Sequence, residues 1–301
     1  MMQADHLPSR PGPIRTWVLA ARVPTLPAAV VPVLVGSAVA WAAGAFQLLP
    51  FVAAMAAALL IQIGTNLAND YFDFRKGADT AERLGPVRIT QSGLMPAETV
   101  RRAAIVTFGL AALIGVYLTA VGGLPILVVG LLSIAAGVLY TGGPWPLGYH
   151  GLGDLTVFVF FGSVAVVGTA FLHAGTVTTL AAVSSLPVAA LVTAILVVNN
   201  LRDVGTDRVA GKRTLAVILG ERGTRIEYLL LLAVAYLAPL VAWTAIGAPR
   251  AFWLPWLTLP LAWHLARVVC TQQGRPLNAA LAGTGRLHLA FGVLWAAGIV
   301  L

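Results

Sequence analysis

The feature that most limits the fold of this chain is a series of apolar runs, each long enough to cross a bilayer. A transmembrane helix needs about 20 predominantly apolar residues to span roughly 30 Å of hydrocarbon. Nine such runs follow one another, at 17–43, 46–70, 98–121, 124–141, 152–174, 178–200, 223–247, 251–271 and 284–301. We therefore expect an all-α polytopic membrane protein, built as one integral-membrane domain over 1–301 with a short N-terminal segment, 1–16.

Composition supports a helical membrane protein over the other classes. Hydrophobic residues make up 59% of the chain and charged residues 10%, whereas soluble domains carry about 25% charged residues. A closed membrane barrel would show strands of alternating polarity, which these runs lack. The first run continues to Ala43 without a small-residue cleavage site, so we expect it to be retained as a helix.

The basic residues predict how the chain is oriented. If successive connections alternate between two sides, every Lys and Arg except Arg250 falls on the side of the N-terminus. The positive-inside rule makes that side the cytoplasm. The net charge of +8 is then explained by topology and attraction to anionic lipid, and nucleic acid is not expected as a partner. All eleven acidic residues lie on the same side, which places the chemistry there.

Two polar connections, 71–97 and 201–222, carry dense charge next to the ends of the second and sixth runs. Asp70, Asp73 and Asp79 form a D-x-x-D-x5-D pattern, and Asp203 and Asp207 form D-x-x-x-D. If the helices continue through them, each motif places two carboxylates on one helix face. Such like charges repel near a bilayer and call for cations between them. Oxygen ligands without cysteine or clustered histidine indicate Mg²⁺.

Basic and amide side chains accompany both motifs. Magnesium sites usually combine one or two carboxylates with substrate phosphate oxygens, and basic groups complement a metal-bound polyanion. We expect Asn66 to join the five aspartates as a metal ligand. The predicted diphosphate-binding residues are Lys76, Arg83, Arg88, Arg202, Lys212, Asn69, Asn199 and Asn200. A membrane protein that binds a diphosphate suggests a substrate with a long apolar tail, such as a polyprenyl diphosphate.

A third connection on the same side, 140–154, is rich in glycine, proline and aromatic residues. Tyr140 and Tyr149 are candidates for substrate contact, although interfacial aromatics are also common membrane anchors. Asp154 opens the fifth run, where it could act as a helix N-cap or in substrate binding. The single cysteine, Cys270, excludes an intrachain disulfide and a cysteine metal cluster.

These motifs resemble those of the UbiA-type intramembrane aromatic prenyltransferases. The segment NLANDYFDFRKGAD (66–79) is similar to their first aspartate motif, and NNLRDVGTDRVAGKRTLAVILG (199–220) to their second. The chain is also similar to the bacterial branch that prenylates 1,4-dihydroxy-2-naphthoate, through 21–38, 83–93, 140–154 and 278–292. Asp79 lies farther from Asp73 than in most of the superfamily, a gap typical of this branch.

The resemblance implies a fold, a reaction and a location. It implies about nine helices around a central cavity, with a cytoplasmic cap from the two charged connections, in the bacterial plasma membrane. The reaction would be Mg²⁺-dependent transfer of a polyprenyl group to 1,4-dihydroxy-2-naphthoate with loss of carbon dioxide. No obligatory protein partner is expected. Residues expected to contact the aromatic acceptor are Tyr140, Tyr149, Gln91 and Asp154.

Two alternatives remain open at this point. The motifs alone are compatible with another acceptor, such as 4-hydroxybenzoate, homogentisate or a chlorophyllide. Paired acidic residues in a membrane protein also occur in cation or lipid transporters. Transport is disfavoured because none of the acidic residues lies near the centre of a predicted span.

Overall fold

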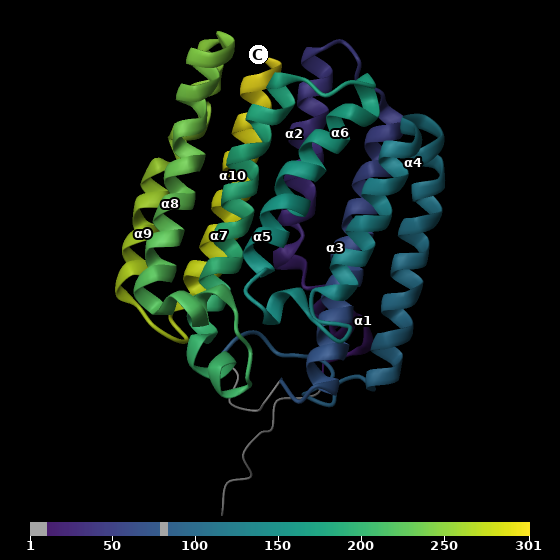
Figure 1. The fold of residues 1–301 in the computed structure, drawn as a ribbon, viewed down its shortest axis with the longest axis vertical. Coiled ribbons are helices and arrows are strands. Elements are labelled where there is room, and N and C mark those ends of the chain that lie inside the picture. The colour runs from purple at the N-terminus through teal and green to yellow at the C-terminus, as the bar shows by residue number, and fades with distance from the viewer. Residues whose placement is uncertain (1–10, 79–83) are drawn as a thin grey trace, which may run out of the picture.

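The computed structural model describes residues 11–78 and 84–301, and within these ranges the regular structure is helical, without strands. Figure 1 shows the helices packed side by side along one long direction. The α-helices are α1 (Pro13–Ala21), α2 (Pro27–Ala42), α3 (Leu48–Arg75), α4 (Ala97–Leu139), α5 (Gly153–Val157), α6 (Ala165–Ala174), α7 (Thr179–Val209), α8 (Leu215–Ile246), α9 (Leu259–Thr271) and α10 (Leu277–Val300). The shorter segments are η1 (Val23–Thr25), η2 (Leu147–Tyr149), η3 (Phe158–Val164) and η4 (Arg250–Thr258).

Six helical segments of the described chain are long and apolar enough to cross a membrane, and a seventh is added if the bent pair 13–25 and 27–42 forms one span. Helix α4 covers two predicted spans, but Gly123, with φ 70° and ψ −163°, interrupts it. A Cβ on Gly137 would lie 3.5 Å from the Phe108 ring. In a straight helix these residues would be about 43 Å apart. The chain therefore turns back near Gly123, between the two predicted spans 98–121 and 124–141.

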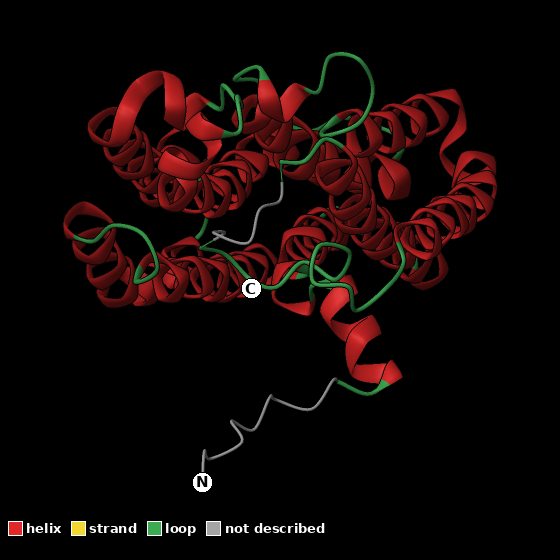
Figure 2. Cartoon of the chain, turned by 90° about the horizontal axis from the view of Figure 1, so that it is seen from below, coloured by secondary structure: helices red, strands yellow, loops and turns green. Residues whose placement is uncertain are grey.

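The total of nine spans stays a prediction. The predicted span 251–271 begins as the 3₁₀ segment η4, and the α-helical part that follows, α9, has 13 residues. The first predicted span, 17–43, is not one continuous helix, because α1 with η1 and α2 meet at an angle of 52°. Two prolines, Pro24 and Pro27, flank the bend and cannot donate backbone hydrogen bonds to the preceding turn. Figure 2 shows α1 standing out from the bundle.

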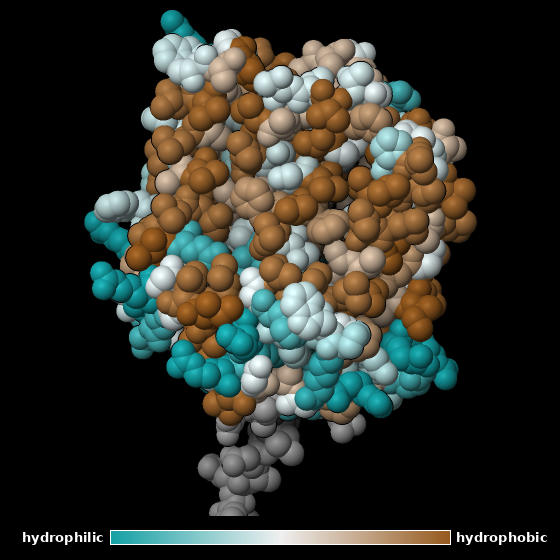
Figure 3. Space-filling view, in the orientation of Figure 1, coloured by the Kyte–Doolittle hydropathy of each residue, from teal (hydrophilic) through white to brown (hydrophobic). Residues whose placement is uncertain are grey.

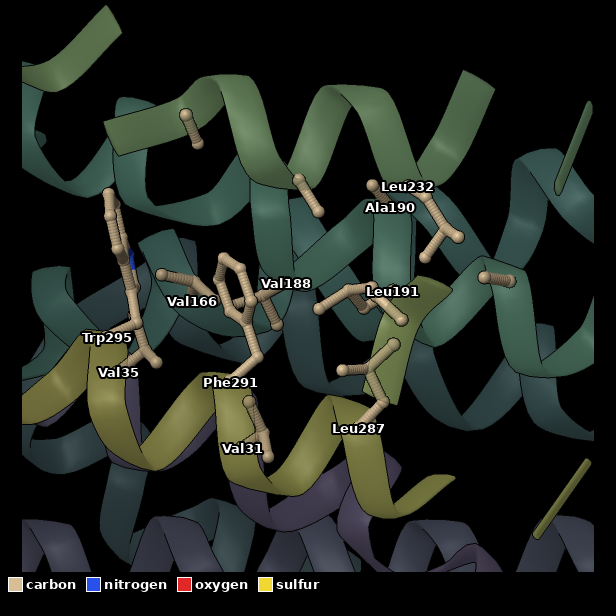
Figure 4. Packing of buried hydrophobic residues seen from close by; sticks show 14 of the residues in the cluster. Val31, Val35, Val166, Val188, Ala190, Leu191, Leu232, Leu287, Phe291 and Trp295 are labelled. Carbon is tan, nitrogen blue, oxygen red and sulfur yellow. The ribbon is translucent and has the colours of Figure 1, made fainter. Parts of the chain in front are cut away.

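Helix α7 lies at the centre of the main hydrophobic core. Buried side chains of α2, α6, α8 and α10 pack around it (Figure 4). Val188 and Leu191 of α7 are fully buried, as are Phe291 and Trp295 of α10. Close approach is possible because small residues line the contacts; a Cβ on Gly162 of η3 would lie 2.1 Å from the Ala189 Cβ. The core thus fixes α7, which carries the second aspartate motif at its end.

The outer helices expose apolar side chains, as expected for a protein surrounded by lipid. Leu113 and Val116 of α4 and Leu237 of α8 are more than half exposed. In Figure 3 hydrophobic residues cover the upper part of the visible face, and hydrophilic residues gather toward the lower end. The C-terminal ends of α3 and α7 lie at this lower end in Figure 1.

Both motif helices extend beyond their predicted spans. Helix α3 continues to Arg75 and α7 to Val209, so four of the motif aspartates lie on helices. The predicted connection 201–222 is therefore largely helical, which corrects the expectation of a long polar loop. A short turn at 210–214 joins α7 to α8, and Gly220 interrupts α8 near its start. Because Asp70 and Asp73 lie on α3, and Asp203 and Asp207 lie on α7, the two carboxylates of each pair share one face of their helix.

Candidate active site

The first motif lies on the buried face of α3 near its end. Asp70 and Asp73 are 4% and 2% exposed, and the helix runs through both. Residues three positions apart share a face of a helix, so the two carboxylates point the same way. Buried carboxylates need charged or hydrogen-bonding partners. The structure supplies different partners to each.

Asp73 is the point where three segments of the chain meet. Its Oδ2 accepts a hydrogen bond from Arg88 Nη2 at 2.8 Å, and its Oδ1 accepts one from the Tyr149 hydroxyl at 2.6 Å. The Lys212 ammonium lies 3.6 Å from the same Oδ1. The connections after α3, α4 and α7 thus each contribute one side chain to a single carboxylate.

Asp70 accepts hydrogen bonds from the backbone of the first charged connection, 71–97. Its Oδ2 accepts from the Ile89 N–H at 3.2 Å, and its Oδ1 accepts from the Thr90 N–H at 3.0 Å. The Arg22 guanidinium lies 3.7 Å from Oδ2. Arg22 adopts a left-handed backbone conformation, with φ 52°, at the end of α1. The bend between α1 and α2 therefore brings a basic side chain to the first motif.

Lys212 links the two motifs. Its Nζ lies 3.9 Å from Asp207 Oδ1 as well as next to Asp73. It also lies over the Tyr149 ring, 4.7 Å from the centroid. Because α3 and α7 are far apart in sequence, this single ammonium is direct evidence that their ends converge.

Lys76 approaches the same ring from the end of α3. Its Nζ lies 5.1 Å from the Tyr149 centroid and donates to the carbonyls of Thr141 and Gly143, at 2.7 and 3.3 Å. Burial lowers the pKa of Lys76 below its usual value of 10.5, with the nearby Asp73 charge opposing this effect. The ammonium groups of Lys76 and Lys212, together with the Tyr149 ring, therefore form a positively charged surface beside Asp73.

Asp203 and Arg202 form a separate cluster at the end of α7. Arg202, whose side chain is 0% exposed, donates to both oxygens of Asp203 and also to Asn199 and Asn278. Asn278 in turn donates to the Leu84 carbonyl at 2.9 Å. The Arg202 guanidinium thus joins α7 to α10, and Asn278 extends this link to the first charged connection, 71–97. The direct contact of Arg202 with a diphosphate stays a prediction.

The remaining predicted site residues occupy varied positions. Asn66 donates to the Ala21 carbonyl at 3.1 Å and to the Thr25 hydroxyl at 3.0 Å, so its amide supports the α1–α2 bend. Asn69 accepts from the Thr141 hydroxyl at 2.8 Å. Asn200 is buried in α7, and Gln91 is half-buried after Thr90. Two predicted residues, Asp79 and Arg83, lie outside the described residues.

The residues are compatible with Mg²⁺ by their chemistry. No group of three or more His, Cys, Asp or Glu side chains in the described ranges is close enough to hold a metal. The oxygen atoms of Asp73 and Asp207 nevertheless share one cation, the Lys212 ammonium. A cation between two carboxylates marks a place of strong negative potential, and hard oxygen donors suit Mg²⁺. Asn66 and the aspartates therefore stay predicted ligands.

The connection 140–154 joins the predicted diphosphate-binding residues to the start of the fifth predicted span. The Tyr149 carbonyl accepts from the Arg213 N–H at 2.9 Å, and a Cβ on Gly153 would lie 2.9 Å from the Tyr140 hydroxyl. Burial raises the pKa of Tyr140, and the charges of Asp154, Asp73 and Asp207 add to this effect. The N-cap hypothesis for Asp154 is wrong: Leu152 is the N-cap of α5, and Asp154 is a buried first-turn residue.

Sequence reasoning missed three residues that contact the motifs. Arg22 and Asn278 lie far from both motifs in sequence, and Thr141 is an ordinary polar residue. The segments 21–38 and 278–292, which carry part of the family resemblance, contain Arg22 and Asn278. That was the available signal, but it does not say which residue faces which carboxylate.

Comparison with known proteins agrees with this architecture. The model of the UbiA prenyltransferase family matches residues 29–298. A Mycobacterium tuberculosis protein described as 1,4-dihydroxy-2-naphthoate octaprenyltransferase is 40% identical over 91% of this chain and 93% of its own length. An Escherichia coli protein of the same description is 42% identical over 70% of each chain.

A solved structure also shares the fold. It is described as a UbiA homologue from Archaeoglobus fulgidus bound to DMAPP and Mg²⁺, and it superimposes with a TM-score of 0.68 at 14% identity. The match covers 95% of this chain and 99% of the other. The chain belongs to the UbiA prenyltransferase family.

Proposed function

We propose that this protein transfers a polyprenyl group from polyprenyl diphosphate to 1,4-dihydroxy-2-naphthoate, with release of carbon dioxide and diphosphate, to give demethylmenaquinol, the reduced form of demethylmenaquinone. The observation that carries this function is the identity of 40% and 42% to two bacterial proteins described as 1,4-dihydroxy-2-naphthoate octaprenyltransferases. The convergence of Asp73, Asp207 and Lys212 supports it, because a diphosphate with its metals needs groups from both motifs.

Magnesium is part of the proposal. The Archaeoglobus fulgidus homologue with the same fold is described as bound to Mg²⁺ and a prenyl diphosphate. In this chain the proposed ligands are Asn66, Asp70, Asp73, Asp79, Asp203 and Asp207. When bound, the metal would act as a Lewis acid that stabilises the negative charge on the departing diphosphate.

The basic residues would act on the same charge. Lys76 and Lys212 both lie over the Tyr149 ring, and the Lys212 ammonium lies next to Asp73. As the allylic carbon–oxygen bond breaks, negative charge grows on the diphosphate, and preorganised cations stabilise it. Arg88 and the Tyr149 hydroxyl hold Asp73 in place, while Arg202 orients Asp203. An allylic cation then reacts with the electron-rich ring carbon that bears the acceptor's carboxylate.

The bilayer would supply the polyprenyl substrate. A long apolar tail partitions into lipid, and the exposed apolar surfaces of α4 and α8 suit a lipid environment. We place the protein in the bacterial inner membrane with the motif ends of α3 and α7 toward the cytoplasm, following the distribution of basic residues.

The direct test is a product analysis with the purified protein in lipid nanodiscs. Octaprenyl diphosphate and Mg²⁺ are supplied with an equimolar mixture of 1,4-dihydroxy-2-naphthoate, 4-hydroxybenzoate and homogentisate. We expect the product mass of the decarboxylated, prenylated naphthoate. A product from another acceptor would show that the acceptor is wrong. Cation flux in proteoliposomes without any prenylated product would favour transport.

A further inference from the structure

Asp154 is a buried carboxylate without a clear structural role. It is 4% exposed, and neither carboxylate oxygen has a hydrogen bond to another residue of the described chain. It lies in the first turn of α5, where the helix dipole favours a negative charge. A buried carboxylate whose remaining lone pairs lack donors costs free energy unless a ligand supplies them. This makes Asp154 a candidate for binding a hydroxyl group.

The surroundings connect Asp154 to the diphosphate residues. Gly153, its neighbour, lies against the Tyr140 hydroxyl, and a Cβ there would be 2.9 Å from that oxygen. Tyr149, which donates to Asp73, precedes Asp154 by five residues in the same connection. The connection 140–154 therefore links Asp154 to the residues proposed to hold the diphosphate.

The π-helical segment η3 follows directly after α5. It extends over Phe158–Val164, and Gly162 in it packs tightly against Ala189 of the buried helix α7. Segments of π-helix inside α-helices are rare and frequently occur at functional sites. This packing holds the start of the fifth span, and Asp154 with it, against the core.

We infer that Asp154 is a catalytic residue that accepts the proton of the acceptor's hydroxyl group during prenyl transfer and then returns it. This inference rests on the proposed function. It applies to the hydroxyl next to the ring carbon that bears the acceptor's carboxylate.

The proton balance of the reaction requires such a group. When the ring carbon forms its bond to the allylic carbon, the bond to diphosphate breaks and the neighbouring hydroxyl becomes a ketone, releasing its proton to Asp154. The carboxylate then leaves as carbon dioxide, and the electron pair of the broken carbon–carbon bond forms an enolate. Asp154 returns the proton to the enolate oxygen, which restores the aromatic diol. No proton is consumed or released overall, so one carboxylate can serve both steps.

Glu227 of α8 offers a matched comparison. Its carboxylate interacts electrostatically with Asp154, and its Oε2 also has no partner in the described chain. Glu227 is half-buried, whereas Asp154 is buried, and it lies on α8 rather than in the connection that contains Tyr149. Replacing it removes a nearby negative charge without removing the proposed proton acceptor.

The test uses the purified protein in lipid nanodiscs with 1,4-dihydroxy-2-naphthoate, octaprenyl diphosphate and Mg²⁺. For Asp154→Asn we expect kcat to fall about 100- to 10,000-fold, the usual effect of removing a general base. The KM for octaprenyl diphosphate and the stabilisation of the protein by that substrate should change little. Asp154→Ala should regain activity with added formate, whereas Glu227→Gln should stay within a few-fold of the natural protein.

Several outcomes would overturn the inference. These are near-normal kcat in Asp154→Asn, no formate rescue in a folded Asp154→Ala variant, or an equal loss in Glu227→Gln. If the variants do not fold, the natural protein can be given the acceptor methylated on the relevant hydroxyl. Inhibition without prenylation supports the inference, and prenylation at a normal rate contradicts it. Failure of the natural protein to prenylate the unmodified acceptor contradicts the proposed function instead.

Discussion

The ammonium group of Lys212 lies 3.6 Å from the carboxylate of Asp73, although one follows α7 and the other lies on α3. This contact joins the two aspartate motifs, since the same Nζ is 3.9 Å from Asp207. Lys212 has an 11% exposed side chain, so solvent screens the pair weakly. The contact therefore defines where a polyanion would meet both motifs.

Replacing Lys212 with methionine should weaken diphosphate binding and catalysis together. A charge-assisted hydrogen bond contributes about 1.5 to 3 kcal/mol, so kcat/KM should fall about 10- to 100-fold. Lys212→Arg should retain part of the activity because the charge remains. Steady-state prenyl transfer in nanodiscs measures this. Arg101→Gln is the control, because Arg101 is exposed and pairs with Glu98; equal losses in both variants would contradict the role of Lys212.

Tyr149→Phe separates two functions of one side chain. The change removes the hydroxyl that donates to Asp73 at 2.6 Å but keeps the ring that faces Lys76 and Lys212. We expect kcat/KM to fall about 10-fold, the effect of one hydrogen bond to a charged group, and to fall further in Tyr149→Leu. If Phe and Leu are equally harmful, the hydroxyl contributes nothing beyond the ring.

Magnesium dependence should be complete and should require both motifs. Chelation with EDTA should abolish prenyl transfer, and added Mg²⁺ should restore it. Asp70→Asn and Asp203→Asn should each lower kcat by about 100-fold or more, because the metal stabilises the departing diphosphate. Glu98→Gln, at the exposed start of α4, should remain active. Full activity after chelation, or in either aspartate variant, would show that the metal mechanism is wrong.

Gly162→Ala should destabilise the fold. The added Cβ would lie 2.1 Å from the Ala189 Cβ, so η3 and α7 would have to separate. Overpacking of this kind costs about 1 to 3 kcal/mol, which should lower the midpoint of thermal unfolding in detergent. Gly168→Ala is the matched control, since its nearest neighbour is the Val129 Cγ1 at 3.8 Å. Equal midpoints for the two variants would contradict this packing.

Prediction from sequence succeeded where the signal is local. The apolar runs indicated membrane helices, and the break between the runs 98–121 and 124–141 indicated the turn at Gly123 inside α4. The shared helix face of Asp70 and Asp73 was conditional on a helix that continues through both, and α3 meets that condition. The first span was wrong as a single helix, and 201–222 was wrong as a long loop, because boundaries depend on packing at the ends of runs.

The partners of the charged side chains were beyond sequence reasoning. The pattern identified Asp73 and Lys212 as members of one site, but it could not show that Tyr149 and Arg88 donate to the same carboxylate. Nor did it indicate Arg22 next to Asp70, or Asn278 next to Arg202. These contacts join residues from distant segments, and no periodicity in the chain encodes them.

The amino-acid sequence by itself determined the class of protein, the polar residues that could bind a diphosphate and the family resemblance. These follow from composition, helix-length apolar runs and short motifs, all of which depend on neighbouring residues. The tertiary structure alone decided that α3 and α7 bring their carboxylates to one ammonium, and that Asp154 is buried without a partner in the described chain. The physical reason is that packing around α7 fixes which helix ends meet, and burial then sets the cost of each unpaired charge.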